Sequence, residues 1–202
     1  MLLPTVLLSS FAAIAATIFL AELTDKDAFL LIGVSTRVSW WTVFLAGSTA
    51  FTLTTVLLVT FGSVLAALVP VVWIRIVGGL VMVGYGFWEA RGLIGLGAVE
   101  KEVSRVERSG NPMREFFALV GALAILDLAG DATEVLTVVF VSQYSDLLLV
   151  FTGCMAGLLT ATALEATLGS RLGRLLTPRR LQYASTTVFI ILGLSILALV
   201  FL

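Results

Sequence analysis

The fold is decided by two stretches, FLAELTDKDAFLL at residues 19–31 and AILDLAGDATEVLTVV at residues 124–139. Each places acidic side chains in the middle of an apolar run. The acids are Glu22, Asp25, Asp27, Asp127, Asp131 and Glu134, and Lys26 lies among the first three. A carboxylate at bilayer depth costs several kcal/mol, so such a group usually faces a partner or a water-filled cavity. One cluster in each half therefore indicates a cation site where two similar halves meet.

The composition is that of an integral membrane protein. The chain has 202 residues, of which 59% are hydrophobic, and its mean hydropathy is +1.11. Helices that face water need a polar side, which this much apolar sequence does not supply. The net charge of −1 gives no indication of nucleic-acid binding.

The single cysteine, Cys154, and the lack of histidine limit the possible cofactors. A disulfide within the chain is impossible. One cysteine and no histidine cannot form the usual thiolate and imidazole sites of zinc, copper and haem. We therefore expect no prosthetic group. The segment MLLPTVLLSS has no basic region before its apolar residues, so we interpret it as the start of the first span and not as a signal peptide.

Turn and charge signals divide the hydrophobic sequence into six expected helices. They cover about residues 4–34, 40–68, 72–90, 115–141, 147–170 and 181–202. The first, second and fourth runs exceed the ~20 residues of one span, so we expect them to tilt or break. The acidic clusters are the natural break points of the first and fourth. Pro70 and Pro178 mark the ends of the second and fifth.

The basic residues predict the orientation. One side of a six-span arrangement carries Arg37, Arg91, Lys101, Arg105, Arg108, Arg114, Arg171, Arg174, Arg179 and Arg180, and the other carries Arg75. The positive-inside rule then places the polar linker in the cytoplasm and both termini outside, in a plasma or inner membrane. Trp40, Trp41, Trp73 and Trp88 fall near expected span ends, as interfacial tryptophans do.

The two halves resemble each other at an offset of about 105–108 residues. The closest parallels are Gly47 with Gly153, Gly62 with Gly169, and Pro70 with Pro178. Three spans per repeat is an odd number, so the second repeat must enter the membrane inverted, which is a transporter architecture. The expected units are residues 1–92, a cytoplasmic linker at 93–114, and residues 115–202.

The spacing of the acids predicts shared helix faces. Glu22 and Asp25 are three residues apart, and Asp127, Asp131 and Glu134 follow an i, i+4, i+7 pattern. Hydroxyls could join them from Thr24, Thr52, Thr54, Thr55, Thr133, Thr160 and Thr162, and Glu165 adds an acid in the fifth run. Such an oxygen set suits Mn²⁺, Ca²⁺ or Mg²⁺. Clustered carboxylates also bind protons as a coupled set, which is the minimal chemistry of a proton-coupled exchanger.

Simpler interpretations remain open at this point. Glu22 and Lys26 could form only an intrahelical i, i+4 ion pair. Asp27 and Glu134 could be solvated near an interface, and Glu165 could be a structural hydrogen-bonding group between helices. Gly153-x-x-x-Gly157 is typical of a helix-packing contact, and Cys154 of a small packing residue.

The residues at positions 22–27, ELTDKD, resemble the Glu-x-Gly-Asp-Lys/Arg-Ser/Thr signature of the Gdt-type cation/proton exchangers, a family of manganese and calcium transporters. That family has two copies of the signature, in the first and fourth spans of an inverted three-plus-three repeat. Here Thr24 stands in place of the glycine and Asp27 in place of the hydroxyl residue.

The second copy, residues 128–133 (LAGDAT), keeps the Gly-Asp pair and Thr133. Leu128 stands where the glutamate belongs, and Ala132 where the basic residue belongs. The resemblance implies that Glu22, Asp25 and Asp131 are ion ligands, with Asp127 or Glu134 as candidates for the lost glutamate.

We therefore expect an all-α, six-span protein of two inverted repeats that exchanges Mn²⁺ or Ca²⁺ for protons. The expected metal ligands are Glu22, Asp25, Asp127 and Asp131, with additional candidates Lys26, Asp27, Thr133, Glu134 and Glu165. The expected partners are the bilayer and the transported ions, and a homo-oligomer is left open. The alternatives are an exporter of another metal or small solute, and an intramembrane metal-dependent enzyme. Lys26 is the only basic residue near the acids, which disfavours phosphate or carboxylate substrates.

Overall fold

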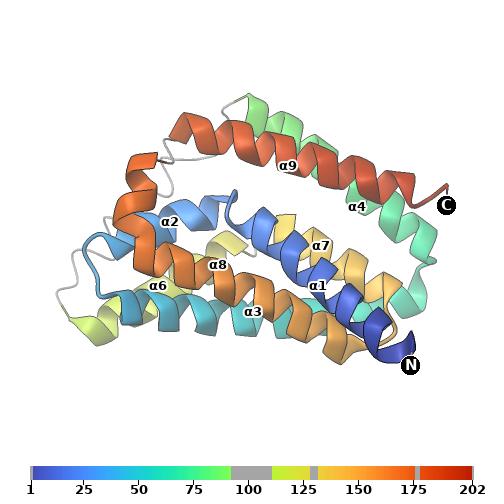
Figure 1. Ribbon diagram of the computed structural model, residues 1–202, viewed down its shortest axis with the longest axis horizontal. Helices are drawn as coiled ribbons and strands as arrows, with labels where there is room; N and C mark the ends of the chain where they lie inside the picture. The colour runs from blue at the N-terminus through green and yellow to red at the C-terminus, as the bar shows by residue number, and fades with distance from the viewer. Residues whose placement is uncertain (1, 92–110, 128–131, 176–177, 202) are drawn as a thin grey trace.

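The computed structural model describes residues 2–91, 111–127, 132–175 and 178–201, and this part of the chain is all-helical (Figure 1). The helices described there are α1 (Leu2–Glu22), α2 (Lys26–Ser35), α3 (Trp40–Leu68), α4 (Val71–Ala90), α6 (Pro112–Asp127), α7 (Ala132–Gln143), α8 (Leu147–Leu175) and α9 (Pro178–Ala198). The first expected run divides at its acidic motif into α1 and α2. The fourth run contains α6 and α7, and the residues between them lie outside the described part.

The helices are those of a multi-pass membrane protein. In the described part, four segments are long and apolar enough to cross a bilayer: Thr5–Glu22, Trp40–Leu68, Val71–Ala90 and Leu147–Gly169. Ala132–Gln143 and Gln182–Ala198 are apolar but shorter than the ~20 residues of a full span. The six-span count therefore stays a prediction.

Short polar side chains and prolines set the helix boundaries. The Ser39 hydroxyl accepts a hydrogen bond from the Thr42 nitrogen at the start of α3. The Asp146 carboxylate accepts two backbone hydrogen bonds at the start of α8. Side-chain oxygens at these positions satisfy N–H groups that have no partner within the helix. Pro70 precedes α4 and Pro178 begins α9, where the missing N–H of proline costs nothing.

The helices of the two halves pack against each other in a reciprocal pattern. α1 and α2 pack against α8, while α6 and α7 pack against α3. α3 also contacts α8, and α4 lies beside α9 along one edge of the molecule (Figure 1). α1 and α2 therefore rest on the long helix of the second half, and α6 and α7 rest on the long helix of the first half. Both termini lie at the same end of the molecule (Figure 1).

Glycines permit the closest of these contacts. A Cβ added at Gly157 would lie 2.6 Å from the Ala15 carbonyl oxygen, and one at Gly153 would lie 2.9 Å from the Ile14 side chain. This confirms the interpretation of Gly153-x-x-x-Gly157 as a helix-packing contact. Cys154 beside it is fully buried, as a packing residue should be.

The α4–α9 pair is joined along its length. A Cβ at Gly193 would lie 2.8 Å from the Gly79 carbonyl oxygen. At one end the Gln182 side-chain amide donates to the Glu89 carbonyl oxygen at 2.7 Å. At the other end the Arg75 guanidinium donates to the Leu199 carbonyl oxygen at 2.9 Å. These contacts make α4 and α9 one two-helix unit.

The outer surface is apolar, with tryptophans near helix ends. Leu53, Leu57 and Phe61 of α3 are among the exposed large apolar side chains, as expected of helices that contact lipid. The exposed tryptophans are Trp40 and Trp41 at the start of α3, and Trp73 and Trp88 near the two ends of α4. Their positions agree with the prediction from the sequence.

Candidate cation site

The first acidic motif forms the connection between α1 and α2. α1 ends at Glu22, and the Thr24 hydroxyl lies 3.1 Å from the Leu20 carbonyl oxygen and 3.0 Å from that of Ala21. Thr24, in place of the glycine in the family signature, thus satisfies carbonyl groups at the end of α1. Asp25 is the N-cap of α2, because its carboxylate accepts a hydrogen bond from the Lys26 nitrogen at 2.6 Å.

Two expectations about this motif are wrong because the helix is interrupted. Glu22 and Asp25 do not share a face of one helix, since α1 ends at Glu22 and α2 begins at Lys26. Glu22 and Lys26 are likewise not an i, i+4 pair within one helix. A turn holds the two acids near each other instead, in which the Asp25 nitrogen donates to the Glu22 carbonyl oxygen at 3.0 Å.

Asp25 also contacts the second half of the chain. The Ala132 nitrogen, at the first residue of α7, donates to the second carboxylate oxygen of Asp25 at 3.5 Å. This distance is at the long limit for a hydrogen bond, so the bond is weak. Its importance is positional: the N-termini of α2 and α7 meet at one carboxylate. Helix N-termini carry partial positive charge and stabilise a negative group.

The structure describes the two ends of the second motif, which lie in α6 and α7. α6 ends at Asp127 and α7 begins at Ala132, and the residues between them lie outside the described part, so the expected i, i+4, i+7 face of Asp127, Asp131 and Glu134 stays a prediction. Asp131 and the side chain of Asp127 lie outside the described residues. Asp131 immediately precedes Ala132 in the sequence, and Ala132 is the residue that contacts Asp25. Thr133, in the first turn of α7, is buried.

Four acidic side chains in the described part are buried almost completely: Glu22, Asp27 and Glu165 have 0% exposure and Asp25 has 2%. The interpretation of Asp27 as a solvated interfacial residue is therefore wrong. No three acidic or cysteine side chains in this part of the chain gather closely enough to hold a metal ion. Because Asp131 and the Asp127 side chain lie outside it, the set of Glu22, Asp25, Asp127 and Asp131 remains a prediction.

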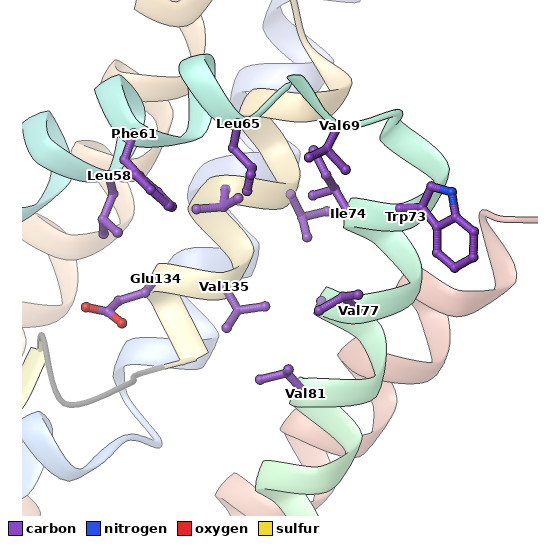
Figure 2. A pocket seen from close by; sticks show the side chains of 13 residues that line it. Leu58, Phe61, Leu65, Val69, Trp73, Ile74, Val77, Val81, Glu134 and Val135 are labelled. Carbon is purple, nitrogen blue, oxygen red and sulfur yellow. The ribbon is translucent and has the colours of Figure 1, made fainter. Parts of the chain in front are cut away.

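Glu134 is placed differently from the other acids. It lies in the first turn of α7 and lines a pocket of about 400 Å³ between α3, α4 and α7. Figure 2 shows its carboxylate beside Leu58 of α3, with Val77 and Val81 of α4 on the far wall. The rest of the lining is apolar. Glu134 is thus partly buried at an apolar wall.

The threonine hydroxyls proposed as ligands mostly bond within their own helices. Hydrogen bonds to carbonyl oxygens four residues earlier are made by Thr52, Thr54, Thr160 and Thr162. Such bonds are common for hydroxyls in membrane helices. They occupy the hydroxyl protons and leave oxygen lone pairs for a cation.

The contact of the Ala132 backbone nitrogen with Asp25 was not predicted from the sequence, because no side chain of Ala132 takes part in it. The sequence did indicate that a helix begins there, because an acidic residue directly before an apolar run is typical of a helix N-terminus. Asp131 before Ala132 fits that signal.

The comparisons with known proteins agree with these motifs. The sequence matches the family described as divalent cation/proton antiporter GDT1 over residues 10–94 and 116–200, which include both acidic motifs. No curated protein and no solved structure matches the chain. The family match covers most of the chain in two segments, one in each half. The chain therefore belongs to the GDT1 family of divalent cation/proton antiporters, which are membrane transporters.

Proposed function

We propose that the protein exchanges Mn²⁺ or Ca²⁺ for protons at a site in the middle of the membrane, between its two halves. The observation that carries the proposal is the contact of Asp25 with Ala132 at the start of α7. This contact joins the first acidic motif to the backbone that directly follows Asp131. Two acidic motifs that are far apart in the sequence thus approach one point.

The proposed ligands are Glu22, Asp25, Asp127 and Asp131. All four are carboxylates, and hard divalent cations such as Mn²⁺ and Ca²⁺ prefer oxygen ligands. Backbone carbonyl groups freed by the break between α1 and α2 would add neutral oxygens, as in other transporters with broken helices.

The exchange follows from competition for the same oxygens. A divalent cation and protons both neutralise a carboxylate cluster, and a buried cluster is costly to leave charged. Cation binding therefore displaces protons, and cation release is coupled to their return. Each cycle moves the two kinds of ion in opposite directions.

The proposed architecture has two inverted repeats, residues 1–92 and 115–202, joined by a linker at residues 93–114. The reciprocal packing supports it. α1 and α2 of the first repeat pack against α8 of the second, and their counterparts α6 and α7 pack against α3, the counterpart of α8. A site at the interface of such repeats can face each side of the membrane in turn.

The proposed location is a plasma or inner membrane, with the linker in the cytoplasm and both termini outside. The excess of arginine and lysine on the linker side supports this orientation.

Metal-driven proton movement in proteoliposomes tests the function. The purified protein would be reconstituted with a pH-sensitive dye inside the vesicles, and Mn²⁺, Ca²⁺, Mg²⁺ and Zn²⁺ would be added outside in turn. We expect Mn²⁺ or Ca²⁺ entry to make the interior more alkaline, because protons leave. Protein-free vesicles are the control. Cation entry without proton movement, or a response to Zn²⁺ alone, would contradict the proposal.

A further inference from the structure

A line of small residues runs along one face of α8, and Glu165 interrupts it. The residues are spaced four apart, so they lie on one side of the helix. They are Gly153, Gly157, Ala161, Glu165 and Gly169, and all five are buried. Small residues in such a line let helices approach closely in membranes. A glutamate in this line is unusual and calls for a physical reason.

The neighbouring glycines show which helices Glu165 faces. Gly157 packs against Ala15 and Phe19 of α1. Gly169, one turn beyond Glu165, packs against α2, where an added Cβ would lie 3.2 Å from the Ile32 carbonyl oxygen and would collide with the Ser35 hydroxyl. Glu165 lies between these two contacts. It is therefore on the side of α8 that faces the α1–α2 connection.

The Glu165 carboxyl group is fully buried, and neither of its oxygens has a hydrogen-bond partner among the described residues. No helix in that part of the chain supplies the partner that a structural hydrogen bond would need. An unpartnered carboxylate is costly in a buried site. Binding of a proton or of a metal cation would offset this cost.

Glu165 is not part of the repeated motifs. At the offset of about 106–107 residues, the corresponding positions of α3 are Val59 and Leu58, which are apolar. The ionisable residues of α1, α2 and the connection between them are Glu22, Asp25, Lys26 and Asp27, and α3 contains none. An acid on α8 thus makes the two sides of the site chemically different.

We propose that Glu165 is a further ligand of the transported divalent cation, supplied by α8 on the α1–α2 side. This inference rests on the proposed function of the acidic motifs. No three acids form a group among the described residues, and the remaining proposed ligands, Asp131 and the Asp127 side chain, lie outside them.

The test compares Glu165→Gln and Glu165→Asp with Glu115→Gln, which makes the same change in the first turn of α6. Mn²⁺ uptake into proteoliposomes would give KM and maximal rate, and Mn²⁺-dependent thermal stabilisation in detergent would report binding. We expect Glu165→Gln to raise the apparent KM and the half-saturating Mn²⁺ concentration about 10-fold or more, because a charged ligand is lost. Glu165→Asp should recover part of this loss, and Glu115→Gln should resemble the wild type.

The outcomes separate this inference from the proposed function. If the wild type moves Mn²⁺ and Glu165→Gln keeps both its KM and its half-saturating concentration, the Glu165 assignment is wrong. A lower melting temperature without metal and an unchanged KM would indicate a structural role instead. If the wild type moves no divalent cation, the proposed function is wrong.

The thermal titration with Mn²⁺ then still decides whether Glu165 binds a cation. If the Gln variant does not fold, the Asp variant must show a reduced affinity, and an unchanged one overturns the inference.

Discussion

Asp25 has a structural role and a proposed ionic role, and the two can be separated by mutation. Its carboxylate caps α2 through the Lys26 nitrogen and contacts the Ala132 nitrogen of α7. Capping needs only an oxygen that accepts a hydrogen bond, and asparagine supplies one nearly as well as aspartate. Cation binding needs the negative charge. The amide variant therefore removes one role and keeps the other.

Asp25→Asn should reduce transport to less than about a tenth of the wild-type rate while membrane insertion and thermal stability are retained, because a charge-assisted contact with the cation is lost. Asp131→Asn should do the same, since its motif is the counterpart in the second half. Asp146→Asn is a matched control, because Asp146 is an exposed cap of α8 far along the helix from Glu165. Uptake assays on all three variants measure this. A wild-type transport rate in Asp25→Asn would show that the charge of Asp25 is not needed for cation binding.

At the scale of elements, backbone contact and not side-chain bulk holds α8 against α1. Gly157 leaves no room for a Cβ, whose nearest neighbours would be backbone atoms of Ala15 and Phe19. Backbone cannot rotate away as a side chain can. The helices would have to separate to admit one methyl group.

Gly157→Ala should therefore destabilise the protein by about 1–3 kcal/mol, the usual cost of overpacking. Gly84→Ala is the matched control on α4, where an added Cβ meets nothing within 4 Å. Alanine favours helix over glycine by up to about 1 kcal/mol, so this control should be neutral or stabilising. Thermal unfolding in detergent compares the two. Equal melting temperatures would show that the α1–α8 contact tolerates the methyl group.

The sequence predicted the helix boundaries better than the relative orientation of the acidic side chains. Hydrophobic runs, Pro70 and Pro178 placed most helix boundaries within a few residues of those observed. The shared face of Glu22 and Asp25 was wrong because the spacing argument assumed that one helix continued through the first acidic motif. Breaks were expected there, but a broken helix resets the angular relation between Glu22 and Asp25. Periodicity alone cannot supply the new relation, because it depends on the turn and on α7 from the other half.

The whole molecule depends on contacts between its halves, since α1 and α2 rest on α8, and α6 and α7 rest on α3. The acids near the α1–α2 break are therefore enclosed by helices from both halves. In the proposed mechanism, the ion leaves when the halves move relative to each other, and protons and cations compete for one enclosed set of oxygens.

Cation affinity should fall as the pH falls. Protons occupy the carboxylate oxygens at low pH, so more metal is needed to displace them. Mn²⁺ titrations followed by thermal shift, from mildly acidic to mildly basic pH, measure this dependence. A constant half-saturating concentration across the range would mean that the acids do not carry the exchanged protons.

The proposed orientation predicts opposite labelling of two exposed positions. Cys154 is fully buried and should give little background with a membrane-impermeant thiol reagent. Thr36→Cys, between α2 and α3, should be labelled only after the cells are opened, whereas Ser145→Cys, between α7 and α8, should be labelled in intact cells. The reverse pattern would invert the topology.

The packing of α4 against α9 means that α4 has no partner helix during most of the synthesis of the second half. Ala90 ends α4, and Ala198 ends its partner 108 residues later. At translation rates of about 5–20 residues per second, synthesis of these residues takes roughly 5–20 s, so α4 is in the bilayer without its partner for that time. During that time the surface around Gly79 and Gly86 faces lipid or a chaperone. A first half expressed alone should stay in that unfinished state, open to proteases until the second half is supplied.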